Sequence, residues 1–167
     1  MKSLNQYIQE KLIVNKDYSD GKIYRPKSFD ELRKIIEDRY KKLGPGTEQN
    51  PIDFNDIDVS NLDSFSNDKD KGIFEKTDFK YIDISDWDVS NIKSMRYMFA
   101  YCETLESVGN LLKWNVSKVT NMSSMFYGCK ALKTVGDISG WDVSNVKSHY
   151  EMFDFCPIKR EYKPKFK

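Results

Sequence analysis

Hydrophobic residues recur at a fixed interval along the second half of the chain, together with the polar residues between them. A six-residue motif of the form Trp-Asp/Asn-Val-Ser-Asn/Lys-Ile/Val begins at Trp87, Trp114 and Trp141, at a spacing of 27 residues. A second motif keeps this step and contains a Met-Phe pair followed three residues later by cysteine. Its members are Met98, Phe99, Cys102, Met125, Phe126, Cys129, Met152, Phe153 and Cys156. Two motifs in one register predict an internal repeat.

Each repeat is predicted to contain a strand, a turn and a short helix. The apolar positions between Met95 and Cys102 fall at i, i+3, i+4 and i+7, which is typical of one face of a helix. The short apolar stretches 79–84, 105–112 and 132–138 have the composition of β-strands. One unit cannot bury its apolar face alone, so we expect the copies to stack and to bury a continuous ladder of Trp, Val, Met, Phe and Cys side chains.

The repeat region is predicted to span residues 52–157. A degenerate copy of the first motif, residues 57–62, lies 30 residues before the Trp87 copy, and three clear 27-residue units follow it. The motif contains Asp, Ser and Asn, whose side chains bond to nearby backbone where a chain turns. We therefore expect these residues at the corner between strand and helix.

Before the repeats, residues 22–51 are predicted to form a capping helix and a linker. Ser28 and Glu31 form a capping box, apolar residues follow at helical spacing, and Gly-Pro-Gly at 44–46 ends the helix. A stack of repeats needs its first open face covered, so we expect this helix to pack on the first repeat. Binding of a partner is the alternative role for this helix.

The repeat pattern resembles the BspA-like, leucine-rich-repeat-related bacterial surface protein repeat, which also occurs in Mycoplasma-type lipoproteins and in phage-encoded proteins. Residues 52–157 carry this resemblance. It implies an α/β solenoid, a short leucine-rich-repeat-like right-handed superhelix, with a binding role and no catalytic residues. The chain has neither a secretion signal nor a lipid-attachment cysteine near its start, unlike the cell-surface members. We therefore expect it in a virion or in the host cytoplasm.

Residues 1–21 are predicted to form an amphipathic arm. Its first residues resemble the capsid-targeting peptides of internal head proteins of T-even-type tailed phages, which begin with Met-Lys and are cut after a Leu/Ile-x-Glu site. Here Ile8 and Glu10 match that processing site. The resemblance implies a phage-encoded, virion-associated protein; a plain terminal helix or an oligomerisation arm is the alternative.

Composition and charge narrow the class of protein further. The 167 residues are 39% hydrophobic and 32% charged, and no apolar run reaches the roughly 18 residues that a membrane-spanning helix needs. The net charge is +3 over residues 1–50, −6 over residues 51–158 and +4 over residues 159–167. We expect no membrane contact, and nucleic-acid contact only through the basic ends, which include the tail 158–167.

Few residues suit catalysis, a cofactor or a metal. His149 occupies a position that methionine fills in the other two copies, and no nucleophile is placed beside it. The three cysteines share one repeat position, which favours buried free thiols. Asp83, Asp86 and Asp88 could be calcium ligands, but hydrogen bonding at the corner explains them without a metal. We expect no enzyme, cofactor or metal site.

Positions that differ between the copies are predicted to face solvent. These are the positions equivalent to residues 96, 97, 100 and 101. Exposed aromatic side chains often anchor protein interfaces; the alternative is that some of them pack against the flanking coil. The candidate partner-binding residues are Tyr97, Tyr101, Tyr127, Tyr150 and Phe155.

These observations predict a non-enzymatic protein–protein interaction or structural module. A phage virion-associated protein of the capsid, head or tail is the first expectation, with a virion protein or further copies of itself as partner. Two alternatives stay open: an intracellular phage effector that binds and inhibits a host protein, and a bacterial surface adhesion-type repeat protein.

Overall fold

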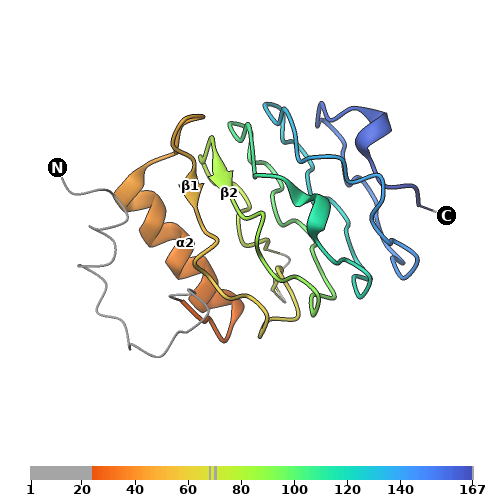
Figure 1. Cartoon of the computed structure of the whole chain (residues 1–167), viewed down its shortest axis with the longest axis horizontal. Coiled ribbons are helices and arrows are strands. Elements are labelled where there is room, and N and C mark those ends of the chain that lie inside the picture. Colours follow the sequence, from red (N-terminus) through yellow and green to blue (C-terminus); the bar gives the residue numbers. More distant parts are fainter. Residues whose placement is uncertain (1–23, 68, 70, 167) are drawn as a thin grey trace.

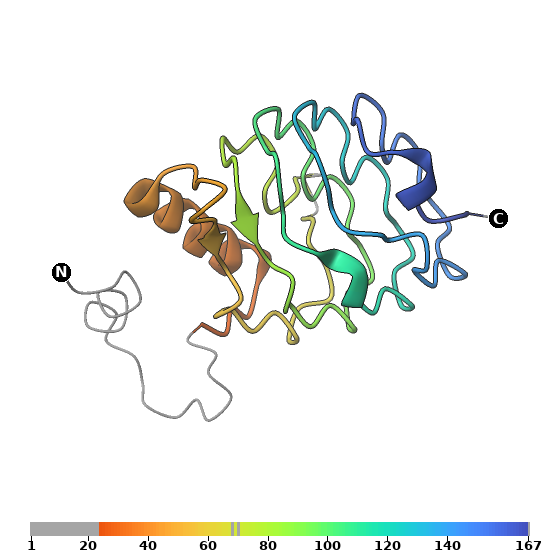
Figure 2. The ribbon, with the colours of Figure 1, turned by 45° about the horizontal axis from the view of Figure 1, so that its top comes forward.

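The computed structural model describes residues 24–67, 69 and 71–166. The expected arm 1–21, with the candidate processing residues Ile8 and Glu10, lies outside the described residues. The helix α2 (Phe29–Leu43) leads into successive coils of chain that lie side by side. Figures 1 and 2 show α2 at one end of this stack and the C-terminal residues at the other.

Helix α2 begins after Ser28, as its capping motif predicts. The Ser28 side chain accepts a hydrogen bond from the Glu31 backbone N–H at 3.2 Å, and the Glu31 carboxylate accepts one from the Lys27 N–H at 2.8 Å. These contacts satisfy N–H groups that the first turn of a helix leaves without partners. Leu32 and Ile36 are completely buried in the core, so α2 covers the first coil of the stack.

Equivalent positions of successive repeats lie next to each other in parallel. Strand β1 (Ile52–Asp53) pairs with strand β2 (Ile82–Asp83) in the register Ile52↔Ile82. Isolated parallel bridges continue this column through Tyr81, Ser107 and Thr134. A second column of parallel bridges joins Ser64, Ser94, Asn121 and Ser148. The coils therefore stack in the register that the 27-residue step predicts.

The helices expected within the repeats are absent from the described part of the chain. Residues 95–102, predicted to be helical, form consecutive turns, and the remaining helical segments are the 3-10 turns η1 (Leu111–Lys113) and η2 (Arg160–Tyr162). Tyr97 and Tyr101 have φ angles of 57° and 59°, which a right-handed helix excludes. Turns with the same apolar spacing also point these side chains inward, so the pattern could not distinguish the two conformations.

The strands expected at 105–112 and 132–138 are also replaced by irregular chain with single bridges. Each coil changes direction after a few residues, so a ladder between neighbouring coils has room for one or two residue pairs. The ordered strands among the described residues are the two-residue segments β1 and β2.

The repeated tryptophans and cysteines connect neighbouring coils. The indole N–H groups of Trp87, Trp114 and Trp141 donate to carbonyls of the preceding coil at 2.8, 3.2 and 3.1 Å. The Cys102 and Cys129 thiols donate to carbonyls of the preceding coil at 2.9 and 3.0 Å. These side chains are buried and the three cysteines are free, as predicted. Each motif therefore fills the core and holds the next coil in register.

Phenylalanine rings form a continuous stack through the core. The rings of Phe74, Phe99, Phe126 and Phe153 have centroids 5.2, 5.3 and 5.5 Å apart in turn, with interplanar angles of 15° or less. Phe153 ends this stack and is only half-buried. The predicted ladder is therefore dry and tightly packed in the middle and partly open at the C-terminal end.

Candidate protein-binding surface

The five candidate contact residues differ in their exposure. Tyr101, Tyr150 and Phe155 are 44%, 71% and 69% exposed, whereas Tyr97 and Tyr127 are half-buried. The exposed three are large apolar side chains at the surface of a rigid stack. They are the residues of this set that a partner can reach without any rearrangement.

Tyr101, Tyr127 and Phe155 form one continuous row, which we call the aromatic row. The rings of Tyr101 and Tyr127 meet edge to face with centroids 5.2 Å apart, and those of Tyr127 and Phe155 do so at 5.5 Å. The Lys76 ammonium lies 5.4 Å from the Tyr101 ring centroid and extends the row by a cation–π contact. Lys76 was not predicted as a member of this surface, because it lies outside the clear repeats.

The backbone of the aromatic row adopts a conformation that disfavours side chains. Tyr101 and Phe155 have φ angles of 59° and 56°, and their equivalent in the middle repeat is Gly128, with φ of 71°. A left-handed conformation costs a non-glycine residue about 1 kcal/mol. Glycine is thus compatible with this position, and two repeats nevertheless carry a large exposed aromatic residue there. Such strain is concentrated at functional sites.

Tyr97 lies apart from the aromatic row. The Arg96 guanidinium is 4.6 Å from the Tyr97 ring centroid, and its Nη2 donates to the Tyr97 hydroxyl at 3.1 Å. The residue equivalent to Tyr97 in the next repeat is Ser124, which is 5% exposed. Tyr97 therefore packs against its own coil, the alternative considered for these residues.

The prediction that variable positions face solvent is wrong for four of them. Ala100, Ser123, Ser124 and Gly128 are buried. Their side chains are small because neighbouring coils approach closely, and the Ser123 hydroxyl is hydrogen-bonded to that of Ser148 in the next coil. Variation between repeats therefore marks local packing as well as exposure.

A groove lies at the C-terminal end of the stack. It has a volume of about 990 Å³ and is lined by residues 149–154 of the last repeat and residues 160–166 of the tail. His149 stacks on Phe166 with ring centroids 4.0 Å apart, and it is exposed where the equivalent methionines are buried. The last repeat has no coil after it, so its side chains at this position meet the tail. Residues 158–166 thus pack on the last repeat, with Ile158 and Pro164 buried.

Tyr150 is the most exposed of the candidate residues and lines this groove. Its hydroxyl hydrogen-bonds to the Glu151 side chain, and this bond to a carboxylate raises the pKa of Tyr150. Tyr150 is therefore a neutral hydrogen-bonding group at the rim of the groove across the physiological range.

The buried thiols are not arranged for nucleophilic chemistry. Burial raises the pKa of Cys102 to about 11 and raises the pKa values of Cys129 and Cys156 above their ordinary value. The thiolate is the reactive form of cysteine, so these side chains stay protonated and unreactive near neutral pH.

The aspartates considered as calcium ligands form corner hydrogen bonds. The Asp83 and Asp88 carboxylates accept the backbone N–H of Ser85 and Ser90, each two residues further on, at 2.9 and 3.0 Å. The hydrogen bonds from Ser90 lower the pKa of Asp88. Among the residues that the structure describes, no group of three or more His, Cys, Asp or Glu side chains is placed to hold a metal ion. No helix within these residues has the length and apolarity needed to span a bilayer.

Comparison with known proteins identifies the family. No curated protein and no solved structure matches the chain. One family model, described as "Mycoplasma protein of unknown function, DUF285", matches residues 47–161, which is more than half of the chain and includes all the stacked repeats. The repeat pattern that resembled Mycoplasma-type proteins is therefore shared with this family, and the chain belongs to the DUF285 family of Mycoplasma proteins.

Proposed function

We propose that this protein is a non-enzymatic protein-binding module whose contact surface is the aromatic row. One observation carries the proposal: Tyr101 and Phe155 expose large aromatic side chains from left-handed backbone positions that glycine fills in the middle repeat. Nothing in the packing of the core requires them, since both are largely in solvent. Aromatic residues in such settings supply much of the binding energy of protein interfaces.

The rigidity of the row supports this role. Each member stands on a different coil, and the coils are joined by backbone hydrogen bonds, such as that from the Tyr101 N–H to the Tyr127 carbonyl at 2.7 Å. A partner that binds three aromatic side chains held in this way immobilises few new side-chain rotamers, so less free energy is lost on association.

The test removes the aromatic side chains and keeps the backbone. Tyr101→Gly combined with Phe155→Gly should abolish capture of a partner by the tagged protein from its natural cells, as quantified by mass spectrometry, with no fall in melting temperature. Leu112→Ala is the matched control, because Leu112 is an apolar side chain 54% exposed away from the row. Unchanged capture by the double variant, or a collapse of its stability, would overturn the proposal.

We also propose, as the first candidate for the cellular setting, that the partner is a virion component and that the chain is phage-encoded. Support comes from the resemblance of the first residues to capsid-targeting peptides, with Ile8 and Glu10 at the processing site. Mass spectrometry of purified particles should find the protein with Lys11 as its first residue. Absence from particles together with copurification of one host factor would support the alternative, an effector that binds and inhibits a host protein.

For the fold class, we propose a short leucine-rich-repeat-like right-handed solenoid closed at its first coil by α2. The two columns of parallel bridges and the intercoil bonds of the tryptophans support this proposal. An experimental structure tests it through the handedness of the coils, and left-handed winding would overturn it.

A further inference from the structure

The turn segments of the repeats form a column with a single hydrogen-bonding direction. We call the segments 95–102, 122–129 and 149–156 the turn column. Alternate N–H groups of the first segment donate to carbonyls of the second, and those of the second donate to the third, at 2.7–3.1 Å. The donors are Met95, Tyr97, Phe99, Tyr101, Met122, Ser124, Phe126 and Gly128. The column therefore presents carbonyls toward the N-terminal end of the stack and N–H groups toward the C-terminal end.

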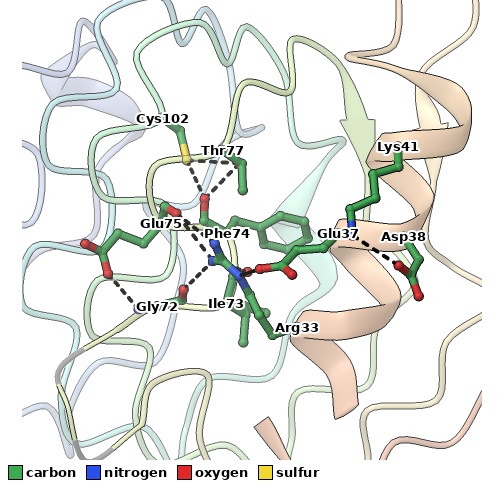
Figure 3. A network of polar contacts seen from close by, with 10 residues as sticks. All are labelled: Arg33, Glu37, Asp38, Lys41, Gly72, Ile73, Phe74, Glu75, Thr77 and Cys102. Carbon is green, nitrogen blue, oxygen red and sulfur yellow. Dashed lines mark hydrogen bonds and ion pairs between the residues drawn. The ribbon is translucent and has the colours of Figure 1, made fainter. Parts of the chain in front are cut away.

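At the N-terminal end, α2 supplies donors for the carbonyls. The Arg33 guanidinium donates to the carbonyls of Gly72, Ile73 and Glu75 at 3.0, 2.8 and 3.3 Å (Figure 3). One cationic side chain thus occupies the place of a preceding row of N–H groups.

At the C-terminal end, the corresponding donors have no such partner. The N–H groups of His149, Glu151, Phe153 and Phe155 stand one repeat after bonded ones, and within the part of the chain that the structure describes none of them has an acceptor. Glu151 and Phe155 have φ angles of 53° and 56°, so left-handed and right-handed residues alternate along this row. Backbone of this kind directs successive N–H groups to one side and forms sites for anionic oxygens.

The row opens into the terminal groove, which carries both signs of charge. Arg160, Lys163 and Lys165 line it on the tail side; the acidic lining residues are Glu151, Asp154 and Glu161. Two of these acids have partners within the molecule. Glu151 is hydrogen-bonded to the Tyr150 hydroxyl, and Glu161 lies 3.8 Å from Lys159. The groove thus combines a row of backbone donors with three cations.

We propose that this end of the stack binds an extended, acidic segment of a partner protein. Carbonyls of the segment accept the N–H groups of His149, Glu151 and Phe153, and its carboxylates pair with the cations of the tail. This arrangement continues the hydrogen bonding of the turn column by one more row, as in strand addition at a sheet edge. The inference deepens the proposed binding function and uses a different surface from the aromatic row.

A second copy of the chain does not fit this site. The carbonyl face of another stack is covered by its own α2, with Arg33 on the carbonyls. Two C-terminal ends facing each other would oppose N–H donors to N–H donors. An occupant must instead bring free carbonyl or carboxylate oxygens.

The test uses the full-length protein and a synthetic probe, an acetylated and amidated octapeptide of alternating Glu and Ala. In the free protein, amide exchange followed by NMR should be much faster at 149, 151 and 153 than at the bonded equivalents 122, 124 and 126. The peptide should slow exchange at the former three and shift their resonances. The same peptide with Gln in place of Glu should bind at least tenfold more weakly.

Charge reversal of the tail supplies the second arm of the test. Arg160→Glu combined with Lys165→Glu should weaken the acidic peptide at least tenfold, since both side chains are exposed and line the groove. Lys113→Glu, the same charge change on η1, is the matched control and should leave the affinity unchanged. Shifts confined to other parts of the stack, or equal binding of the Gln peptide, would overturn the inference. Failure here with partner capture still lost in the aromatic-row variant would leave the proposed function standing.

Discussion

The two ends of the stack differ in how their core and backbone are closed. At the N-terminal end the 15-residue helix α2 buries Leu32 and Ile36 completely. Its Arg39 also forms a two-pronged ion pair with Asp56, at 2.7 and 2.9 Å. At the C-terminal end a three-residue 3-10 turn and a short tail leave Phe153 half-buried. The first end is closed by the chain itself, whereas the second leaves a groove and a row of donors.

This difference indicates that closing a stack of repeats requires more than apolar cover. A coil without a neighbour exposes its ladder side chains and one row of backbone groups, and both have to be satisfied. α2 does both, through its buried face and through Arg33. The tail provides apolar cover through Ile158 and Pro164, but no acceptors for the row of N–H groups.

The largest expected effect compares one truncation at both ends. Ile36→Ala removes a completely buried side chain and should lower the free energy of unfolding by about 4 kcal/mol, whereas Ile158→Ala should cost about 2 kcal/mol because the end coil relaxes more easily. Urea denaturation followed by circular dichroism measures both. Equal losses would show that the two ends are closed equally well.

Removing the Arg33 donor tests the polar part of the closure. Arg33→Met should leave the carbonyls of the first coil without a partner and lower the free energy of unfolding by about 2 kcal/mol. Glu37→Gln is the control, since it removes only the ion pair between Arg33 and Glu37 and should cost less than about 0.5 kcal/mol. A change of similar size in both variants would contradict the role of Arg33 as a backbone cap.

The left-handed column allows a test in the middle of the stack. Gly128→Ala should cost about 1 kcal/mol of unfolding free energy, because the added Cβ meets its nearest neighbour, Tyr101, at an ordinary 3.5 Å and only the φ of 71° opposes it. Gly140→Ala is the control, since that glycine has nothing within 4 Å of an added Cβ and no left-handed φ. Thermal denaturation gives the comparison, and no loss at Gly128 would show that this column is unstrained.

The smallest expected effect is the pH dependence set by the buried thiols. The pKa of Cys102 is raised from 9.0 to about 11, so its contribution to stability is complete below pH 9 and is lost as pH rises toward 11. From pH 8 to pH 10 the wild type should lose about 1 kcal/mol more than Cys102→Ala, by urea denaturation. An equal loss in both would show that the thiol ionises as readily in the fold as in the unfolded chain. Cys156 at the open end should react first with a thiol reagent.

Much of the core was predictable from sequence, because it depends on residue type and register. The step that places Trp87, Trp114 and Trp141 in one column also places their indole N–H groups on successive coils. The conformation of residues 95–102 was not predictable, because a helix and a series of turns give the same apolar spacing. The choice depends on where the N–H groups find acceptors, and here these lie 26 residues away in the next coil.

The candidate site shows the same division. Tyr101, Tyr150 and Phe155 were correctly predicted to be exposed, since they are large and vary between copies. The pairing of Tyr101 with Tyr127 crosses the 27-residue register by one position, so alignment of the repeats alone could not reveal the aromatic row. Lys76 and the tail residues around Phe166 entered the surface only through their positions in space.

The sequence by itself determined the repeat, its register, the capping helix and the residues of the buried ladder, because hydrophobic periodicity and capping motifs act over short distances. Only the tertiary structure decided the direction of the backbone hydrogen bonds in the turn column and the left-handed positions of Tyr101 and Phe155. It also decided the difference between the two ends of the stack. These features depend on which coil lies next to which, and an end of the stack exists only where a neighbouring coil is missing.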